Sequence, residues 1–386
     1  MWKVLILMFA MLSITACELE ATQEELTNSD NSSEETEVEN LNNNDQGLNE
    51  NDHLEEKNEE IETHDEEVEV YSFDDTEEHF IAVEELTEII GGRYDYDEID
   101  KSLTISISGR EFYLVYGVPV LEIDGVYKDS DRVLVKEDEE GKAYVTKSFV
   151  EEGLEMDYEF DDEESVVTFS WTDEVVQAWA SFGQEEVDIH SFSTDDMIDY
   201  LSFLDKPIEG ASVSTVESHL PGAPRDYRNG THEGIDWYDY ASGIEISTDT
   251  PIYAMAEGVV VRVDDDFEDY SSHEVRDYDL NLASEVGFTP EYIFDKLRGM
   301  QVWVQYDNGV MNRFAHLDSI PEDLELGQTV TEETVIGYVG NSGTSGALNQ
   351  DNSGLHLHQD LLIYGELFWE PFTLDETASI LQELWP

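Results

Sequence analysis

The sequence predicts a mostly β protein in which an α+β accessory domain over residues 70–171 precedes a C-terminal antiparallel β-sheet domain over residues 212–386. Runs of Val, Ile and Tyr separated by Gly, Asp and Asn are typical of antiparallel strands. Such runs occur at residues 250–263, 300–306 and 334–339. A chain of 386 residues is long for one domain, since about 150 residues per domain is the usual prior. The hydrophobic fraction of 40% is enough for real cores.

The accessory domain contains an internal repeat. Alternating aromatic and acidic residues at 94–97 return at 158–161, and a strand-forming segment follows each copy. An amphipathic segment precedes each copy, at residues 80–90 and 144–152, with a glycine after it. The pattern predicts a duplicated unit of helix, glycine, strand, acidic turn and strand.

This duplicated helix-strand-strand module resembles the copper amine oxidase N-terminal-like domain of secreted bacterial proteins. The resemblance implies an accessory role, either as a passive spacer, which is favoured, or as a module that contacts the cell wall. His79 is the only histidine of the repeat. The sequence therefore indicates no metal cluster there, despite the family name.

The net charge of the chain is extreme. Its 18 Lys and Arg stand against 93 Asp and Glu, which gives a formal net charge of −75 at pH 7. A protein that binds nucleic acid needs a basic surface that releases counterions from the phosphates, so this class is excluded. Docking on anionic lipids through a basic face is excluded for the same reason.

Residues 1–16 have the features of a bacterial lipoprotein signal peptide. Lys3 is followed by an apolar stretch over residues 4–12, which is too short to span a bilayer as a helix. Ala16 and Cys17 resemble a lipobox, in which the cysteine sulfur takes a diacylglycerol. Cys17 is the only cysteine, so it is the expected lipidation site and no disulfide can form within the chain. An ordinary signal peptide is the alternative.

Two acidic segments flank the expected accessory domain. Residues 17–69 are rich in Glu, Asp, Asn, Ser and Thr and have almost no aromatic residues. Such a segment cannot bury enough apolar surface to fold, so we expect a disordered tether. Residues 172–211 are expected to form a helical connector, with a helix over residues 194–204 that Pro207 and Gly210 end.

Four histidines and one aspartate of the C-terminal domain form a candidate metal site. His232 and Asp236 come early, His316 lies in the middle, and His356 and His358 come late. Histidine and aspartate are good zinc ligands, and a catalytic zinc has three protein ligands and an open position. Residues two apart on a strand point to one face, so the last two histidines are expected to enter the same site.

The C-terminal domain carries three motifs in order: His-x-x-x-Asp, then aromatic-x-His-Leu, then His-x-His after a turn rich in Gly, Ser and Thr. This order resembles the lysostaphin/LytM-type zinc metalloendopeptidases. The resemblance implies a metallopeptidase domain that holds one Zn²⁺ per chain through His232, Asp236 and His358. It also implies that His356 is the general base, and that His316 stabilises the developing oxyanion or helps to hold the water. The His/His/Asp set favours zinc over other divalent ions.

The sequence departs from this pattern near its end and at two insertions. Asp360 stands two residues after the last histidine, on the same strand face, and is expected to orient that histidine. One insertion occupies residues 264–298, and its segment 289–297 is expected to be a helix capped by Thr289. A shorter insertion occupies residues 347–353. Both are expected to wall the groove and to change which peptide fits.

Several residues close to the motifs have two interpretations. Arg225 and Arg228 either contact substrate carboxylates or form ion pairs with nearby acids, and ion pairs are favoured. His219 is a candidate groove residue. Packing is slightly favoured over groove lining for three aromatic residues: Trp237, Tyr238 and Tyr240.

The resemblance implies a lipid-anchored zinc endopeptidase that cleaves peptide cross-links or stem peptides of bacterial peptidoglycan. Its partners would be these peptides and, through the lipid on Cys17, the membrane. It would act at the extracellular face of the plasma membrane, within the cell wall. A catalytically latent regulator of other wall hydrolases is one alternative, and a wall-binding lipoprotein is another. The bond stays open among a glycine bridge, a stem-to-bridge link and a direct link between stem peptides.

Overall fold

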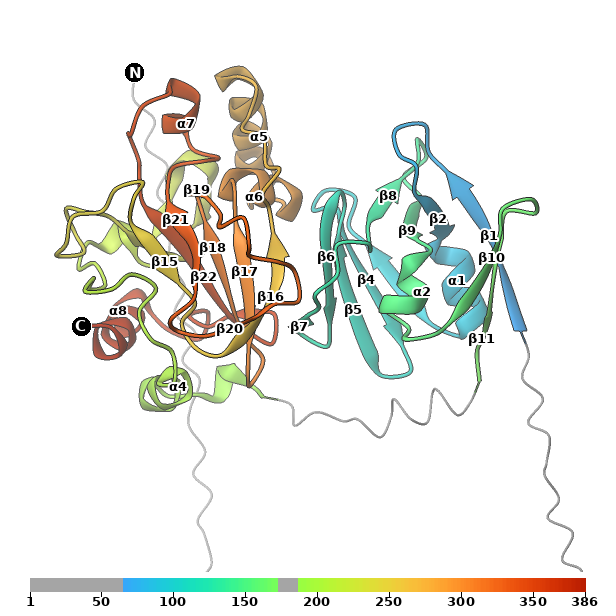
Figure 1. Cartoon of the computed structure of the whole chain (residues 1–386), viewed down its shortest axis with the longest axis horizontal. Helices are drawn as coiled ribbons and strands as arrows, with labels where there is room; N and C mark the ends of the chain where they lie inside the picture. Colours follow the sequence, from blue (N-terminus) through green and yellow to red (C-terminus); the bar gives the residue numbers. More distant parts are fainter. Residues whose placement is uncertain (1–64, 173–186) are drawn as a thin grey trace, which may run out of the picture. The chain divides into compact units, whose positions relative to one another are not determined.

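The computed structural model describes residues 65–172 and 187–386 (Figure 1). The expected signal peptide, Cys17, most of the expected tether and part of the expected connector lie outside the described residues. Within the described ranges, no helix is both long enough and apolar enough to cross a membrane. The protein is strand-rich with some helices, and its strands pair in antiparallel sheets, as the sequence predicts.

The accessory part is built from two sheets and two helices. Its elements are β1 (Asp65–Ser72), β2 (His79–Ala82), α1 (Val83–Ile90), β3 (Arg93–Tyr96), β4 (Ser102–Ile107), β5 (Arg110–Val115), β6 (Val118–Ile123), β7 (Val126–Tyr127), β8 (Val135–Glu137), β9 (Ala143–Thr146), α2 (Ser148–Glu152), β10 (Tyr158–Asp161) and β11 (Val166–Ser170). One sheet has the strand order β10-β11-β1-β2-β9-β8 and the other has the order β3-β4-β5-β6-β7. Strand β1 begins at Asp65, so the folded chain starts inside the segment expected to be a tether.

The two copies of the repeat share one turn geometry. Asp97 Oδ1 accepts hydrogen bonds from the main-chain N–H groups two and three residues later, both at 2.8 Å. Asp161 Oδ1 accepts the equivalent pair at 2.9 and 3.0 Å. The residue four positions after each aspartate is left-handed, with φ of 62° at Lys101 and 55° at Ser165. The expected acidic turn between two strands is therefore confirmed in both copies.

The helix expected before each copy is present and a glycine follows it, but each helix begins later than the amphipathic segment does. Residues 80–82 end β2 and only then does α1 begin, while residues 144–146 end β9 before α2 begins. Strand β2 pairs with β1 on one side and β9 on the other, and its Phe80, Ile81 and Ala82 are fully buried. Pairing on both edges overrides the local helical periodicity.

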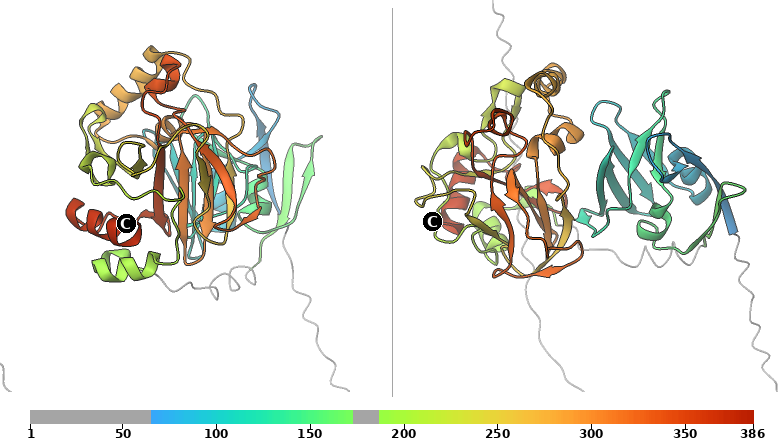
Figure 2. Two further views of the ribbon diagram at one scale, coloured as in Figure 1. Left: turned by 60° about the vertical axis from the view of Figure 1, so that its left-hand side comes forward. Right: turned by 45° about the horizontal axis from the view of Figure 1, so that its top comes forward.

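The C-terminal part contains a long antiparallel sheet with a smaller one beside it (Figures 1 and 2). Its strands are β12 (Pro224–Arg225), β13 (Gly230–Thr231), β14 (Ile235–Trp237), β15 (Pro251–Tyr253), β16 (Gly258–Val263), β17 (Val302–Tyr306), β18 (Val310–Ala315), β19 (Leu317–Ser319), β20 (Thr329–Val330), β21 (Val335–Val339), β22 (Leu357–Ile363) and β23 (Glu366–Leu367). The long sheet has the order β14-β22-β18-β17-β16-β20, with β23 paired to β22, and the smaller has the order β15-β21-β19. The predicted strand runs fall in β15 to β17 and in β21.

The helices of this part are α4 (Thr194–Leu201), α5 (His273–Val286), α6 (Glu291–Arg298), α7 (Ser345–Asn349) and α8 (Leu374–Leu384), and its 3₁₀ turns are η1 (Ile189–Ser191), η2 (Glu217–His219) and η3 (Asp226–Arg228). Helices α4 and α8 lie side by side (Figures 1 and 2). Met197 and Leu201 of α4 are fully buried in one core with Ile380 and Leu381 of α8. The helix expected in the connector is therefore present, but it belongs to the C-terminal core.

The long insertion forms α5 and α6, between β16 and β17. Helix α6 begins after Pro290, and Thr289 does not cap it. The capping prediction was wrong because Thr289 is buried and its Oγ1 accepts a hydrogen bond from Arg228 Nη1 at 2.8 Å. Helix α5 was not predicted. Its C-terminal signal is Gly287, which is left-handed with φ of 87°.

Candidate metal centre

Three neighbouring strands bring the five predicted site residues together. Asp236 of β14 stands opposite His358 of β22. Strand β18 ends beside the same histidine, and His316 is the next residue along the chain. His356 directly precedes β22, and His232 directly follows β13. Residues more than 120 positions apart in the sequence therefore meet because β14, β22 and β18 are adjacent strands.

A glycine allows this close pairing. A Cβ atom on Gly234 would lie 2.4 Å from the carbonyl oxygen of Gln359 and 2.6 Å from Oδ1 of Asp360. Neither atom can retreat easily, since one is backbone and the other is buried. The segment that carries the early motif can thus lie directly against β22 only with glycine at this position.

Three donor atoms converge at the centre of the site. His232 Nε2 lies 3.0 Å from Asp236 Oδ1, His358 Nδ1 lies 2.9 Å from the same oxygen, and the two nitrogens are 3.2 Å apart. All three side chains are buried. Two imidazole nitrogens and a carboxylate oxygen are a common zinc donor set, and these atoms are close enough to hold one ion. The residues therefore fit a zinc ion.

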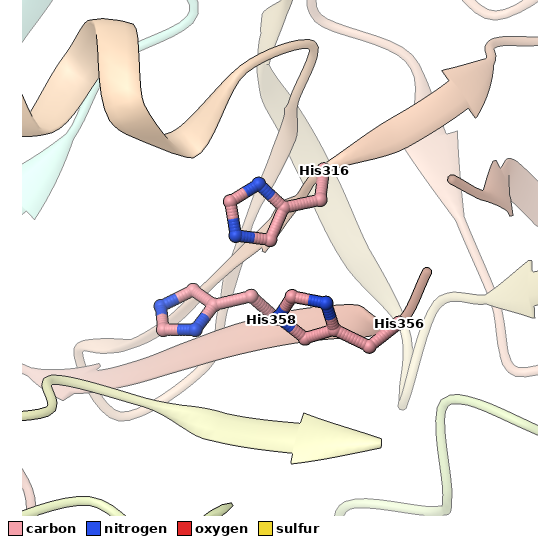
Figure 3. A group of neighbouring side chains, drawn as sticks. All are labelled: His316, His356 and His358. Carbon is pink, nitrogen blue, oxygen red and sulfur yellow. The ribbon is translucent and has the colours of Figure 1, made fainter. Parts of the chain in front are cut away.

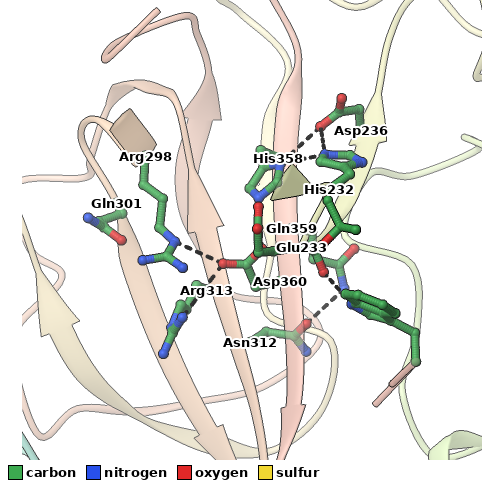
Figure 4. Close-up of polar contacts among 12 residues, drawn as sticks. His232, Glu233, Asp236, Arg298, Gln301, Asn312, Arg313, His358, Gln359 and Asp360 are labelled. Atoms are coloured by element: carbon green, nitrogen blue, oxygen red, sulfur yellow. Dashed lines mark hydrogen bonds and ion pairs between the residues drawn. The ribbon is translucent and has the colours of Figure 1, made fainter. Parts of the chain in front are cut away.

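Both metal-site histidines are oriented by hydrogen bonds from their outer nitrogens, and Figure 4 shows His358 beside Asp360. His232 Nδ1 donates to the carbonyl oxygen of Leu220 at 3.0 Å, and His358 Nε2 donates to Asp360 Oδ1 at 2.7 Å. A carbonyl or carboxylate oxygen can only accept, so the outer nitrogen of each ring carries a proton. The inner nitrogen of each ring is then the one that can bind a metal.

Asp360 is itself held by two arginines. Its Oδ2 accepts a hydrogen bond from Arg298 Nε at 2.9 Å, and Arg313 Nη1 lies 3.8 Å away (Figure 4). Burial raises the pKa of Asp360, but His358 and Arg298 outweigh burial and hold it below its usual range. The carboxylate therefore stays ionised and orients the histidine, as expected.

His316 and His356 lie beside His358 (Figure 3). Their ring centroids are 4.7 Å apart. His316 Nδ1 donates to the carbonyl oxygen of Ser342 at 2.8 Å, and His356 Nδ1 donates to that of Gly354 at 2.6 Å. Neither of these main-chain hydrogen bonds uses the Nε2 atom of its ring. Burial, and then the neighbouring histidines, lower the pKa of His316 well below its usual value, so this ring is neutral.

The backbone at His316 is left-handed, with φ of 60°. This conformation costs a residue with a side chain about 1 kcal/mol. The main-chain N–H of His316 donates to the carbonyl oxygen of Arg298 at 2.7 Å. A strained backbone held by the end of α6 is typical of a functional position.

A pocket surrounds the histidines, and two of the three aromatic candidates line it. Tyr238 and Tyr240 line the pocket, and the Tyr238 ring stacks on His356 at 4.4 Å between centroids and 12° between planes. Trp237 instead packs in the core and is fully buried. Packing is therefore confirmed for the tryptophan, which ends β14 on the face opposite Asp236. It is wrong for the two tyrosines, which follow the strand and lie at the pocket.

His219 also lines the pocket. Its Nδ1 lies 2.8 Å from Ser214 Oγ, and its Nε2 lies 3.0 Å from the hydroxyl of Tyr240. Since Ser214 Oγ already accepts from a main-chain N–H, its hydroxyl proton is free for the imidazole. The candidate groove residue therefore positions a tyrosine at the pocket wall.

Arg225 and Arg228 both line the pocket and both form ion pairs. Arg228 Nη2 donates to Glu233 Oε2 at 2.7 Å, and Arg225 Nη2 donates to Asp236 Oδ2 at 3.2 Å. The favoured interpretation of both is confirmed. Arg225 holds the carboxylate oxygen that does not face the two metal-site histidines.

The long insertion supplies pocket residues that the sequence analysis did not single out. Arg276 of α5 lines the pocket together with Phe294, Leu297 and Arg298 of α6. The wall expected from this insertion is therefore confirmed. The shorter insertion does not line the pocket; instead its Asn349 Oδ1 lies 3.0 Å from His273 Nε2 of α5.

The sequence matches no model of a known protein family and no curated protein. Three solved structures are similar to parts of the chain. The catalytic domain of the prophage-encoded M23 protein EnpA from Enterococcus faecalis has 19% identity and a TM-score of 0.27, covering 45% of this chain and 97% of its own. The catalytic domain of the antimicrobial peptidase lysostaphin from Staphylococcus simulans has 16% identity and a TM-score of 0.22. This match covers 46% of this chain and 90% of the lysostaphin domain. The SpoIIIAH and SpoIIQ complex has 18% identity and a TM-score of 0.25, with coverages of 42% and 94%. Such low values carry no argument about activity.

Zinc binding to the metal-free protein is expected to release about one proton near neutral pH. Burial lowers the pKa of His358, but Asp360 and Asp236 outweigh burial and raise it to about 9. The inner nitrogen must lose its proton before it binds zinc, so affinity should rise about tenfold per pH unit below this pKa. Titration calorimetry in two buffers of different ionisation enthalpy counts the proton. A count of zero at neutral pH would contradict the raised pKa.

Proposed function

We propose that the protein is a zinc-dependent endopeptidase that cleaves peptides of bacterial peptidoglycan. The observation that carries the proposal is that the four site histidines make two different kinds of contact. The inner nitrogens of His232 and His358 converge with an oxygen of Asp236. Two further histidines lie beside them, and the Nε2 atom of each is not used in its main-chain hydrogen bond. A purely structural metal site is closed and needs no such neighbours.

A zinc ion held by His232, Asp236 and His358 would supply Lewis acidity and lower the pKa of a bound water. The remaining steps belong to the protein. His356 Nε2 takes a proton from the attacking water and later gives it to the leaving amine, as a general base and acid. His316, held neutral by burial, stabilises charge that develops on the carbonyl oxygen.

The choice of peptidoglycan as substrate rests on the sequence motifs, which resemble the lysostaphin/LytM-type enzymes. Lipidation of Cys17 and a position at the outer face of the membrane belong to the same proposal. A radiolabelled fatty acid that enters the wild-type chain but not Cys17→Ser would support the anchor. Labelling of neither chain would remove it.

The function is tested by digesting purified peptidoglycan with the zinc-loaded protein and identifying the products by mass spectrometry. New peptide termini are expected, and they should disappear with a chelator and return when zinc is added. Their masses identify the bond. A zinc-loaded protein that cuts no wall preparation but stimulates a separate wall hydrolase would overturn the enzyme in favour of the regulator.

A further inference from the structure

The pocket at the metal centre is cationic although the protein is strongly acidic. Four arginines line it, whereas Glu233 and Asp236 are its only carboxylates among the described residues. The chain as a whole has 93 acidic and 18 basic residues. A divalent metal would add further positive charge. Positive side chains therefore outnumber negative ones in the pocket lining, the reverse of the chain as a whole, and such an excess favours anionic groups.

Three of the four arginines are already neutralised. Arg228 pairs with Glu233, Arg298 with Asp360 and Arg225 with Asp236. A guanidinium that is bidentate or buried on a carboxylate has little capacity for another anion. These three shape the pocket and hold the metal-site residues.

Arg276 differs from the other three, because no carboxylate of the described residues pairs with it. Its Nε donates to the carbonyl oxygen of Gly343 at 3.3 Å. A guanidinium has five N–H groups, and the four on its terminal nitrogens find no acceptor among the described residues. The side chain is only partly buried and lines the pocket. These terminal groups match the geometry of a carboxylate, which accepts two parallel hydrogen bonds.

The segment that carries Arg276 is fastened to the turn beside the catalytic histidines. Asp269 Oδ1 accepts from the main-chain N–H of Gly343 at 2.6 Å. The preceding residue, Ser342, accepts from His316. A Cβ atom on Gly343 would lie 2.4 Å from the carbonyl oxygen of Leu297, so the turn also packs directly on α6. The insertion thus holds its arginine at a fixed place in the same pocket.

We infer that Arg276 binds a free carboxylate of the peptide substrate and makes the site selective for acidic peptides. The inference rests on the proposed function and narrows it. A glycine bridge has no side-chain carboxylate, whereas a stem peptide carries acidic groups. The enzyme therefore cuts stem peptides in preference to glycine bridges, and Arg276 is the specificity residue.

Binding is measured first, with the full-length, zinc-loaded His356→Ala variant and two peptides that differ only in one glutamate or glutamine beside the scissile bond. The acidic peptide is expected to bind about tenfold tighter, as for a charge-assisted hydrogen bond. Adding Arg276→Gln should reduce the affinity ratio of the acidic to the neutral peptide to about twofold or less. Arg276→Lys should keep part of this affinity ratio. Lys296→Gln is the matched control. Lys296 lies on α6, is half exposed and pairs with Asp279, and this variant should keep the full ratio.

The outcomes separate this inference from the proposed function. If Arg276→Gln weakens the binding of both peptides equally, the arginine only holds the insertion against the turn, and the inference is overturned. Equal binding of the two peptides to the parent variant also overturns it. The His356→Ala variant could bind the acidic peptide about tenfold tighter while the wild-type protein cleaves neither peptide. That result would support the carboxylate-binding site and contradict the enzymatic function. With active wild type, kcat/KM for the two peptides should differ in the same ratio.

Discussion

Replacing His358 with alanine is expected to reduce the zinc content from about one ion per chain to a trace. His358 Nδ1 lies 2.9 Å from Asp236 Oδ1 and 3.2 Å from His232 Nε2, so the substitution removes one of three convergent donors. Two remaining ligands bind zinc much more weakly than three. Elemental analysis of the dialysed protein measures the loss, and peptide cleavage should vanish with it.

A surface histidine provides the control for this prediction. His190 Nε2 lies 2.9 Å from Glu366 Oε2, and these two residues with Glu370 form an exposed group that is also close enough to hold an ion. His190→Ala should keep the full zinc content. If it lost zinc while His358→Ala kept it, the metal would belong to the exposed group and the buried centre would be wrong. Thermal unfolding of both variants separates metal loss from a failure to fold.

The meeting of the candidate site residues could be predicted in part from the sequence, because strand spacing determines which face a side chain enters. His356, directly before β22, and His358 and Asp360 within it alternate with buried apolar or amide residues. Their common face follows from this spacing alone. The motif order then placed Asp236 and His316 near them, although only the pairing of β14 and β18 with β22 brings these residues within reach.

The pocket wall could not be predicted in the same way, because long-range contacts decide it. Thr289 has the local context of a helix cap, yet it binds Arg228, which is 61 positions away in the sequence. Arg276 lies on a helix whose preceding segment is tied by a hydrogen bond from the main-chain N–H of Gly343 to Asp269, across 74 positions. Local propensity carries no information about such contacts. The composition of the wall, and with it the substrate preference, therefore required the structure.

Replacing His356 with alanine is expected to lower kcat by about 100- to 10,000-fold, the usual contribution of a general base, while zinc is retained. Its Nδ1 donates to Gly354 at 2.6 Å, and its ring stacks on Tyr238. These two contacts fix the ring plane and occupy Nδ1, which leaves Nε2 as the nitrogen that can act as the base. This atom lies 3.3 Å from Asp236 Oδ1, beside the metal donors but outside the proposed ligand set.

The pair of alanine variants therefore separates metal binding from proton transfer. His358→Ala should lose zinc and activity together, whereas His356→Ala should lose activity alone. The double variant should lose little more activity than His358→Ala alone, because the effects of residues that act as a unit are not additive. Full activity in His356→Ala would instead assign the base to His316, whose ring lies 4.7 Å from that of His356 and is held neutral by burial. Loss of zinc in His356→Ala would move His356 into the ligand set and leave the neutral His316 to carry the proton.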